Sequence, residues 1–228
     1  MPASHCLDVM RIAAKGLPLL LLAVLPAWAQ NAPLGWVADP RTGCRVWDAP
    51  LRPNETMSWS GACAETIAQG RGVLVWTTDG KQTSRYEGDV RDGKLNGRGV
   101  FTYPNGSCYT GEFRDNLRSG RGTMAFLNGN SYDGQWRDNE RNGSGVYTWV
   151  TTGTRYDGEW RASKRHGRGI TTYPTARYEG EYRDDLPNGN GVLTDGGDVY
   201  SGSWSNGCFQ QGARKIALDV QYKDCGFK

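Results

Sequence analysis

Aromatic residues recur along the chain at a nearly constant interval. A Tyr-x-Gly triplet occurs six times with steps of 22 to 24 residues, starting at Tyr86, Tyr109, Tyr132, Tyr156, Tyr178 and Tyr200. Eleven residues after each of the first five tyrosines stands a Gly-x-Gly triplet. A fixed period of this length is typical of a repeat protein. The pattern therefore predicts tandem copies of one small structural unit.

Each unit has the residue order of a β-hairpin. With each tyrosine counted as position 0, position 4 holds Val90, Phe113, Trp136, Trp160, Tyr182 and Trp204. Position 17 holds Tyr103, Phe126, Trp149 and Tyr173, and Asp195 breaks this rule in the fifth unit. Tyr-x-Gly-x-Trp has a period of two, so its rings and glycine are expected on one face of a strand. Turn formers such as residues 92–96 and 138–142 follow, and Gly-x-Gly begins a return strand.

A register follows from this hairpin. We expect position 4 to pair with position 11, 3 with 12 and 2 with 13 in the same unit, so that the glycines leave room for the rings. The alternative is that glycine serves only in turns. On the other face, positions 3 and 12 would form weak, solvent-facing ion pairs. The predicted ion pairs are Asp89 with Arg98, Glu112 with Arg121, and Glu159 with Arg168.

The first 29 residues have the features of a cleaved secretory signal. Arg11 and Lys15 precede an apolar run over 17–25, and Ala27-Trp28-Ala29 follows it. The run is shorter than the ~20 residues of a transmembrane helix, and no later segment approaches that length. We therefore expect a mature protein that begins at Gln30, is periplasmic or extracellular, and is not an integral membrane protein.

Composition narrows the class of protein further. Glycine accounts for 32 of the 228 residues, about twice the usual share of roughly 7%. The 11 Tyr, 9 Trp and 5 Phe are too many for a disordered glycine-rich linker. The formal charge is only +3 and no long run of one sign occurs, which argues against a nucleic-acid partner.

Export would place the cysteines in an oxidising compartment. Two of them flank an N-terminal Pro-containing segment and two bracket the last segment, so we predict the disulfides Cys44–Cys63 and Cys208–Cys225, with Cys108 as a thiol. Spacing alone does not fix this connectivity. No Cys-x-x-Cys pair occurs, and one histidine remains after position 29, so no metal site is expected.

The repeat resembles the MORN family, whose unit reads approximately Tyr-x-Gly-x-Trp, a short variable stretch, and Gly-x-Gly. The resemblance covers residues 86–212 and extends to an earlier, divergent unit, in which Trp59-Ser-Gly61 precedes Gly70-Arg-Gly72 by the same eleven residues. It implies successive hairpins in one sheet, and roles in scaffolding, self-association and lipid-linked binding. We expect an exported bacterial member. Val90 and the last unit, which lacks Gly-x-Gly, depart from the pattern.

These observations give one fold class and five segments. We predict an all-β protein, an elongated single-layer antiparallel sheet of MORN hairpins with disulfide-stapled terminal caps. The alternation of Ile216, Leu218, Val220 and Tyr222 predicts a strand in the last cap. The segments are a signal peptide (1–29), an N-terminal cap (30–58), a divergent first repeat (59–85), the repeat array (86–212) and a C-terminal cap (213–228).

The sequence favours a binding protein over an enzyme. Gly-x-Ser-x-Gly, His-Glu-x-x-His and kinase motifs are absent, and His166 stands where other units have turn residues. No catalytic residue, cofactor or metal is predicted; a glycosidase-like carboxylate pair is the weak enzymatic alternative.

An open sheet cannot bury its aromatic face alone, so we expect exposed rings that bind a protein partner or a second copy of the chain. An anionic lipid headgroup or an envelope glycan is the alternative ligand. A third interpretation is that the rings only pack on one another. The candidate binding residues are Tyr109, Phe113, Tyr132, Trp136, Tyr156, Trp160, Tyr178 and Tyr182.

Overall fold

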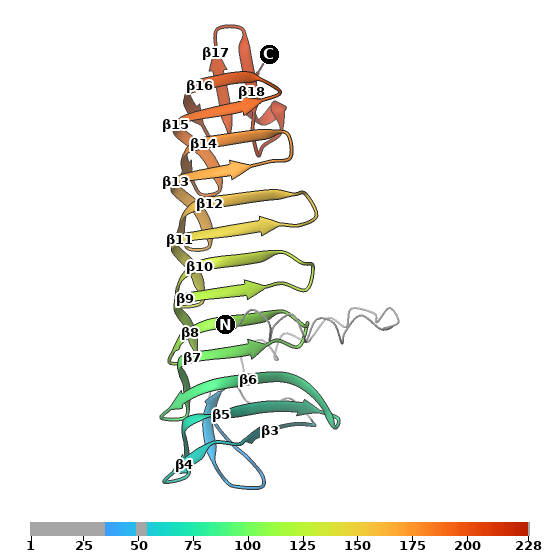
Figure 1. The fold of residues 1–228 in the computed structure, drawn as a ribbon, viewed down its shortest axis with the longest axis vertical. Coiled ribbons are helices and arrows are strands. Elements are labelled where there is room, and N and C mark those ends of the chain that lie inside the picture. The colour runs from blue at the N-terminus through green and yellow to red at the C-terminus, as the bar shows by residue number, and fades with distance from the viewer. Residues whose placement is uncertain (1–34, 49–53, 228) are drawn as a thin grey trace. The chain divides into compact units, whose positions relative to one another are not determined.

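The computed structural model describes residues 35–48 and 54–227, which are mostly β-strand (Figure 1). The predicted signal peptide lies outside the described residues. Among those described, no helix has the length and apolar character needed to cross a membrane. The chain divides into two compact units. The first unit contains the chain up to Ser119 and, in addition, residues 124–127. The second unit contains residues 120–123 and the chain from Asn128 onward.

The first unit contains eight complete strands. They are β1 (Gly35–Ala38), β2 (Arg45–Asp48), β3 (Glu55–Trp59), β4 (Ala62–Ala64), β5 (Ile67–Thr78), β6 (Lys81–Arg91), β7 (Lys94–Thr102) and β8 (Cys108–Arg114). Strands β5 to β8 pair antiparallel in chain order. One parallel pairing, Arg45 with Ile67 between β2 and β5, makes the sheet mixed. Strand β9 (Leu117–Ala125) has residues in both units.

The second unit continues the series of hairpins. Its strands are β10 (Ser131–Arg137), β11 (Glu140–Trp149), β12 (Thr154–Arg161), β13 (Lys164–Thr172), β14 (Ala176–Arg183), β15 (Leu186–Asp195), β16 (Asp198–Ser205), β17 (Cys208–Gln211) and β18 (Arg214–Ala217), followed by the 3-10 helix η2 (Tyr222–Cys225). Each strand from β10 to β18 pairs antiparallel with the next. The predicted all-β fold of successive hairpins in an open sheet is confirmed.

The hairpin turns are tighter than predicted. Asp138 and Asn139 have φ of 50° and 69°, and β11 begins at the next residue. Two consecutive positive φ values are typical of a type I′ turn, whose twist matches that of the flanking strands. Ala162 and Ser163 form the equivalent turn with φ of 49° and 64°. The turn is thus two residues long, where the sequence predicts five.

The observed register differs from the prediction at one point. Gly134 pairs with Gly145 inside a hairpin, which confirms the pairing of positions 2 and 13. Trp136 then pairs with Arg141, because a β-bulge interrupts the strands. Gly143, at position 11, has a φ of 88° and pairs with Trp160 of the next hairpin. Glycine at position 11 therefore supplies a left-handed bulge conformation, and the predicted pairing of positions 4 and 11 occurs between repeats.

The bulge also changes the role of position 3. The carboxylate of Glu159 accepts a hydrogen bond from the backbone N–H of Arg168 at 2.8 Å. Gln135 accepts one from the N–H of Ser144 at 2.7 Å. The side chain at position 3 thus accepts a hydrogen bond from the backbone N–H at position 12, which the bulge leaves without a backbone acceptor in its own hairpin.

The predicted side-chain pairing of positions 3 and 12 is accordingly wrong in two of three cases. Within the described residues, no ion pair joins Asp89 to Arg98 or Glu159 to Arg168. The face of the sheet opposite the rings, here called the outer face, instead carries ion pairs within single strands. These pairs are Arg85 with Glu87, Arg155 with Asp157, and Arg177 with Glu179. The third predicted pair, Glu112 with Arg121, joins residues of different units and stays a prediction.

Both predicted terminal disulfides are present. Cys44–Cys63 joins the residue before β2 to β4, and Cys208–Cys225 joins β17 to η2. The prediction that Cys108 is a thiol is wrong, because Cys108 is disulfide-bonded and buried at the start of β8. None of the four cap cysteines is its partner, since these are bonded to one another.

The two caps are built differently. The buried carboxylate of Asp39 accepts the N–H groups of Trp59 and Arg41, at 2.9 and 2.8 Å, and fixes the N-terminal segment. These hydrogen bonds, with the charge of Arg41, outweigh the desolvation of the carboxyl group and lower its pKa.

The predicted strand over 216–222 is wrong beyond Ala217, because the chain bends and forms η2.

Candidate functional site

The eight predicted binding residues form the core of the hairpin array. Trp136 is the most exposed of them at 6%, and the four tyrosines at position 0 are fully buried. We expected part of these rings to be exposed, and the structure corrects that expectation. Their contribution to binding stays a prediction, but a ligand cannot reach them directly.

The rings are buried because they pack between repeats as well as within them. The ring of Trp160 makes edge-to-face contacts with Tyr156 of its own repeat and Tyr132 of the preceding one, with centroids 5.2 and 5.4 Å apart. Tyr182 lies in the same way between Tyr178 and Tyr156. Edge-to-face pairs at these distances are favourable. Trp160 and Tyr182 thus each join two successive repeats.

Glycines at positions 2 and 13 make room for the tyrosine. A Cβ on Gly134 would lie 2.5 Å from the hydroxyl oxygen of Tyr132, and one on Gly145 would collide with the same group. The same conflict occurs at Gly158 and Gly169 with Tyr156. Two of the three repeated glycines are therefore explained by ring packing, as predicted.

The polar atoms of the buried rings are satisfied by backbone carbonyls. The Tyr132 hydroxyl donates to the carbonyl of Gln135 at 3.0 Å, next to the bulge. The indole N–H of Trp160 donates to the carbonyl of Gly145 at 2.9 Å. Burial raises the pKa of Tyr132 to about 12 and also raises the pKa of Tyr86. These stacked, buried rings of positions 0 and 4, here called the buried ladder, are neutral at physiological pH and are suited to packing.

The divergent first hairpin has the same internal geometry. Trp59 takes the place of the tyrosine, and a Cβ on Gly61 or Gly72 would collide with its ring. Its indole N–H donates to the carbonyl of Ala62, three residues on, at 2.8 Å. Gly70 has the left-handed φ of a position 11 glycine, 75°.

A second layer of rings lies above the buried ladder in the second unit. Tyr147 and Trp149 are half-buried, with ring centroids 4.3 Å apart, and Tyr147 contacts the Trp160 ring at 6.2 Å. Tyr173 is also half-buried at position 17 of the following repeat. The position 17 rings recur in the sequence, but they are not among the eight binding residues that the sequence predicted.

Arginines at position 9 lie over the same face. The Arg141 guanidinium is 4.2 Å from the Trp160 ring centroid and 5.1 Å from that of Tyr147. Arg165 lies 5.0 Å from the Tyr182 ring. We call the surface formed by Arg141, Tyr147, Trp149, Arg165 and Tyr173 the aromatic–arginine face. It combines half-buried rings with oriented cations.

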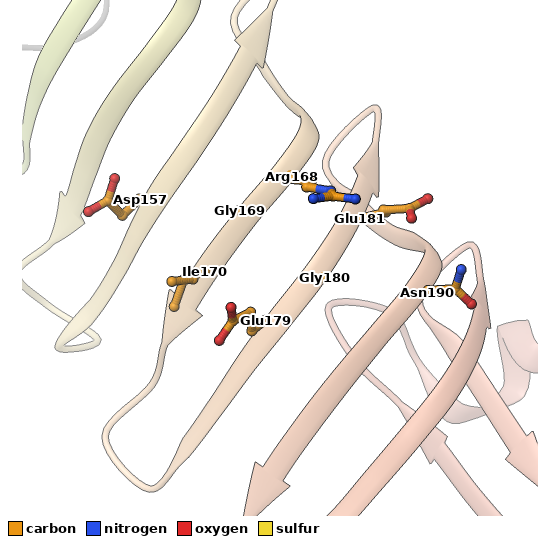
Figure 2. Close-up of a pocket in the computed structure, with 8 residues that line it drawn as sticks. All are labelled: Asp157, Arg168, Gly169, Ile170, Glu179, Gly180, Glu181 and Asn190. Atoms are coloured by element: carbon orange, nitrogen blue, oxygen red, sulfur yellow. The ribbon is translucent and has the colours of Figure 1, made fainter.

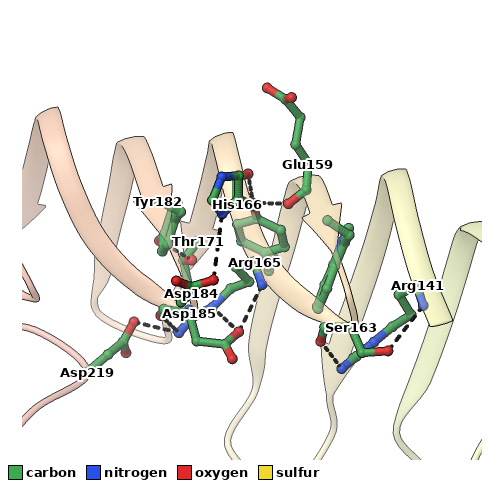
Figure 3. Close-up of polar contacts among 12 residues, drawn as sticks. Arg141, Glu159, Ser163, Arg165, His166, Thr171, Tyr182, Asp184, Asp185 and Asp219 are labelled. Atoms are coloured by element: carbon green, nitrogen blue, oxygen red, sulfur yellow. Dashed lines mark hydrogen bonds and ion pairs between the residues drawn. The ribbon is translucent and has the colours of Figure 1, made fainter.

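The position 9 residue is held by the turn of the next hairpin. Arg141 receives a hydrogen bond at its carbonyl from the N–H of Ser163, and its own N–H donates to the Ser163 hydroxyl at 3.2 Å. Arg165 is bound in the same way by Asp185, whose backbone carbonyl also accepts from the guanidinium (Figure 3). These contacts fix the orientation of both arginines.

The C-terminal segment reaches this face through Asp219. Its carboxylate contacts the Arg165 guanidinium at 3.0 Å (Figure 3). It also accepts a hydrogen bond from the Tyr173 hydroxyl at 2.9 Å. The Arg165 side chain is only 12% exposed. Burial lowers the pKa of Arg165, but the charge of Asp219 opposes this and the pKa is raised overall. The pKa of Tyr173 is raised mainly by burial and further by Asp219.

His166 lies in β13, and the prediction that it is a surface turn residue is wrong. It pairs in register with Glu159, and its side chain is partly buried. Its Nδ1 atom has no hydrogen-bond partner and lies 3.9 Å from a carboxylate oxygen of Asp184. This geometry adds nothing in favour of catalysis.

The outer face of the sheet has a shallow depression of about 440 Å³ in the second unit (Figure 2). The backbone at two glycines forms its floor, and charged and apolar side chains project on both sides. Its lining residues are Asp157, Arg168, Gly169, Ile170, Glu179, Gly180, Glu181 and Asn190. The side chains are those of a solvated strand surface. No group of three or more His, Cys, Asp or Glu suited to a metal ion occurs in the described part of the chain.

The fold and the ladder define a class of protein, a tandem β-hairpin repeat protein with a stacked aromatic core. The family model of the MORN repeat matches residues 86–108, 109–131, 132–154, 156–175 and 178–197. This chain is a MORN repeat protein, as the resemblance in the sequence implied. MORN repeats are non-catalytic and generally bind proteins or membrane lipids. No curated protein gave a significant match to the chain.

Proposed function

We propose that this chain is an exported, non-enzymatic interaction protein that binds a protein partner on its aromatic–arginine face. The observation that carries the proposal is the half-buried pair of Tyr147 and Trp149 beside the oriented guanidinium of Arg141. Tyr, Trp and Arg are the residue types that most often anchor protein interfaces. Because the buried ladder holds these groups in place, little ordering is needed on binding.

A protein ligand is favoured over a purely electrostatic contact with a membrane. Membrane-surface binding of that kind uses clusters of four or more basic residues. The aromatic–arginine face has two arginines, and Arg165 is already paired with Asp219. Binding of an anionic lipid or a glycan is the alternative outcome of the experiment below.

Export is supported by the sequence of residues 1–29 and by the disulfides Cys44–Cys63 and Cys208–Cys225. Structural disulfides persist in oxidising compartments such as the periplasm. Mass spectrometry of protein from the native host should find Gln30 at the N-terminus. Retention of Met1 or Met10 would contradict export. Peptide mapping of the same sample would identify the disulfide partner of Cys108, which is not one of the four cap cysteines.

The binding proposal is tested with Trp149→Ala and a matched control, Val192→Ala. Val192 is exposed and pairs with Glu179, which lines the outer face. Pull-downs from envelope extract, quantified by mass spectrometry, should yield a protein that wild type and Val192→Ala retain and Trp149→Ala loses. Circular dichroism melts establish that both variants fold. Loss of binding to phosphatidylglycerol vesicles instead, with no protein affected, would favour the lipid alternative.

A further inference from the structure

Asp219 shows which chemical group the aromatic–arginine face can hold. It lies between β18 and η2 and has a φ of 63°, which turns the chain there. Its carboxylate contacts Arg165 at 3.0 Å with one oxygen and the Tyr173 hydroxyl at 2.9 Å with the other. One carboxylate thus fills a site made by position 9 and position 17 of the same repeat.

The Arg165 guanidinium is also held by contacts other than the one with Asp219. The Arg165 guanidinium lies over the Tyr182 and Tyr156 rings, at 5.0 and 5.7 Å, and donates to the carbonyl of Asp185. A guanidinium so positioned loses little side-chain freedom when it binds an anion. Hydrogen bonds between such a cation and a carboxylate are stronger than neutral ones.

The preceding repeat has the same arrangement. Arg141 lies over the Trp160 ring and donates to the carbonyl of Ser163 at 2.5 Å, as Arg165 does to that of Asp185. Trp149 takes the position of Tyr173. Its indole ring contacts the Tyr147 ring and has no hydroxyl group.

Resting on the proposed function, we propose that the aromatic–arginine face binds carboxylate side chains of an extended acidic segment in a partner protein. Arg141 and Arg165 would each hold one carboxylate, and Asp219 is the chain's own occupant of the Arg165 site. An acidic peptide is favoured over a phosphate ligand because the occupant seen in the structure is a carboxylate carried by a peptide chain.

The repeat spacing sets the spacing of the acidic residues. Two strands separate equivalent positions in successive repeats, which corresponds to about 10 Å across a sheet. A polyproline II segment places residues i and i+3 on one side, roughly 9 Å apart. The preferred ligand therefore carries Glu or Asp at i and i+3 in a proline-rich context.

The test uses the full chain and the fluorescein-labelled peptide Gly-Pro-Glu-Pro-Pro-Glu-Pro-Gly, with fluorescence anisotropy as the readout. Control peptides have Gln in place of both Glu residues, or the two Glu residues adjacent. We expect Arg141→Gln to weaken binding about tenfold, as loss of an interface anchor does. Asp219→Asn should strengthen it at least about threefold, since it removes the internal competitor. Arg168→Gln, on the outer face, should have no effect.

Several results would overturn the proposal. These are equal binding of the Gln peptide, equal losses with Arg141→Gln and Arg168→Gln, or no gain with Asp219→Asn. If Arg141→Gln fails to fold, Arg141→Lys keeps the charge without the planar fork and should still weaken binding. Vesicles of phosphatidylglycerol that bind through Arg141 while the peptide does not would make the ligand a lipid headgroup.

Failure of this inference is distinguishable from failure of the proposed function. A captured protein that is lost with Trp149→Ala but unaffected by Arg141→Gln would leave the interaction role standing and refute carboxylate recognition.

Discussion

The hydroxyl group of Tyr132 occupies the space that a side chain on Gly145 would need. The two residues belong to paired strands, β10 and β11, of one hairpin. The ring of Tyr132 therefore lies against the backbone of its own hairpin, and it makes edge-to-face contacts with Trp136 and Trp160, which belong to two repeats. This relationship explains why Tyr and Gly recur together, and it leads to the first prediction.

Gly145→Ala should lower stability by ~1–3 kcal/mol, because the added methyl group overpacks the site under the Tyr132 ring. Thermal and urea unfolding measure the change. Gly35→Ala is the matched control, since a Cβ there meets nothing within 4 Å. Tyr132→Phe removes one of the colliding atoms and should partly suppress the defect. Equal stability of Gly145→Ala and wild type would contradict the packing described for the tyrosine.

Trp160→Ala should destabilise the protein by ~3–5 kcal/mol, the usual effect of truncating a buried aromatic residue. The change removes contacts with two tyrosines and the hydrogen bond to Gly145. Trp160→Phe should cost less, because a ring remains. Val150→Ala, whose side chain is 59% exposed, is the control and should be close to neutral. A stable Trp160→Ala variant would show that the ladder is not the core.

The role of Glu159 is tested by a double-mutant cycle with Arg168. Glu159→Ala should cost about 1 kcal/mol, since the backbone N–H of Arg168 loses its acceptor. Arg168→Ala keeps that N–H and should change stability by less than about 0.5 kcal/mol, as exposed substitutions do. The coupling energy should be near zero. A coupling energy of 1 kcal/mol or more would restore the side-chain ion pair that the sequence suggested.

Alkaline pH should unfold the protein cooperatively. Burial raises the pKa of Tyr132 from 10.0 to about 12 and raises that of Tyr156 as well. Below the ordinary pKa the hydroxyl is neutral in both states, so its contribution to stability is fully present. Above pH 10 the unfolded chain loses the proton first, and stability falls as the pH rises through the folded-state value.

Tyrosinate absorbance and circular dichroism, recorded against pH, check this expectation. The absorbance of the buried tyrosines should rise together with the loss of folded signal, above the titration of a tyrosine peptide. Tyr132→Phe removes one linked group and should make the loss of stability with pH less steep. Full ionisation near pH 10 with the fold intact would contradict burial of the hydroxyl groups.

The sequence predicted the hairpin repeat because Tyr132 and its equivalents keep a constant offset to Gly-x-Gly. It did not separate the roles of the two glycines. Gly145 makes room for a ring and Gly143 adopts a left-handed conformation, and the same residue type serves both. Because of the bulge, Trp160 pairs with the position 11 glycine of the preceding repeat, Gly143, and not with that of its own repeat.

The binding surface was less predictable. Period-two alternation places Tyr132 and Trp136 on one face but does not show whether neighbouring repeats cover them. That depends on edge-to-face contacts across repeats, such as Tyr132 with Trp160. The contact of Asp219 with Arg165 joins a cap to the array, and no repeated spacing indicates it.

Trp160 and Tyr182 each contact tyrosines of two repeats, which has a consequence for how such chains change length in evolution. A gain or loss of one whole period, wherever the crossover falls, recreates the Tyr132–Trp160 type of junction at the new boundary. The middle of the array is therefore indifferent to copy number. The C-terminal end does depend on repeat number, because Asp219 contacts Arg165 and Tyr173, which lie at a fixed distance before it in the sequence. Duplications are best tolerated upstream of Arg165, where the cap and its binding site move together.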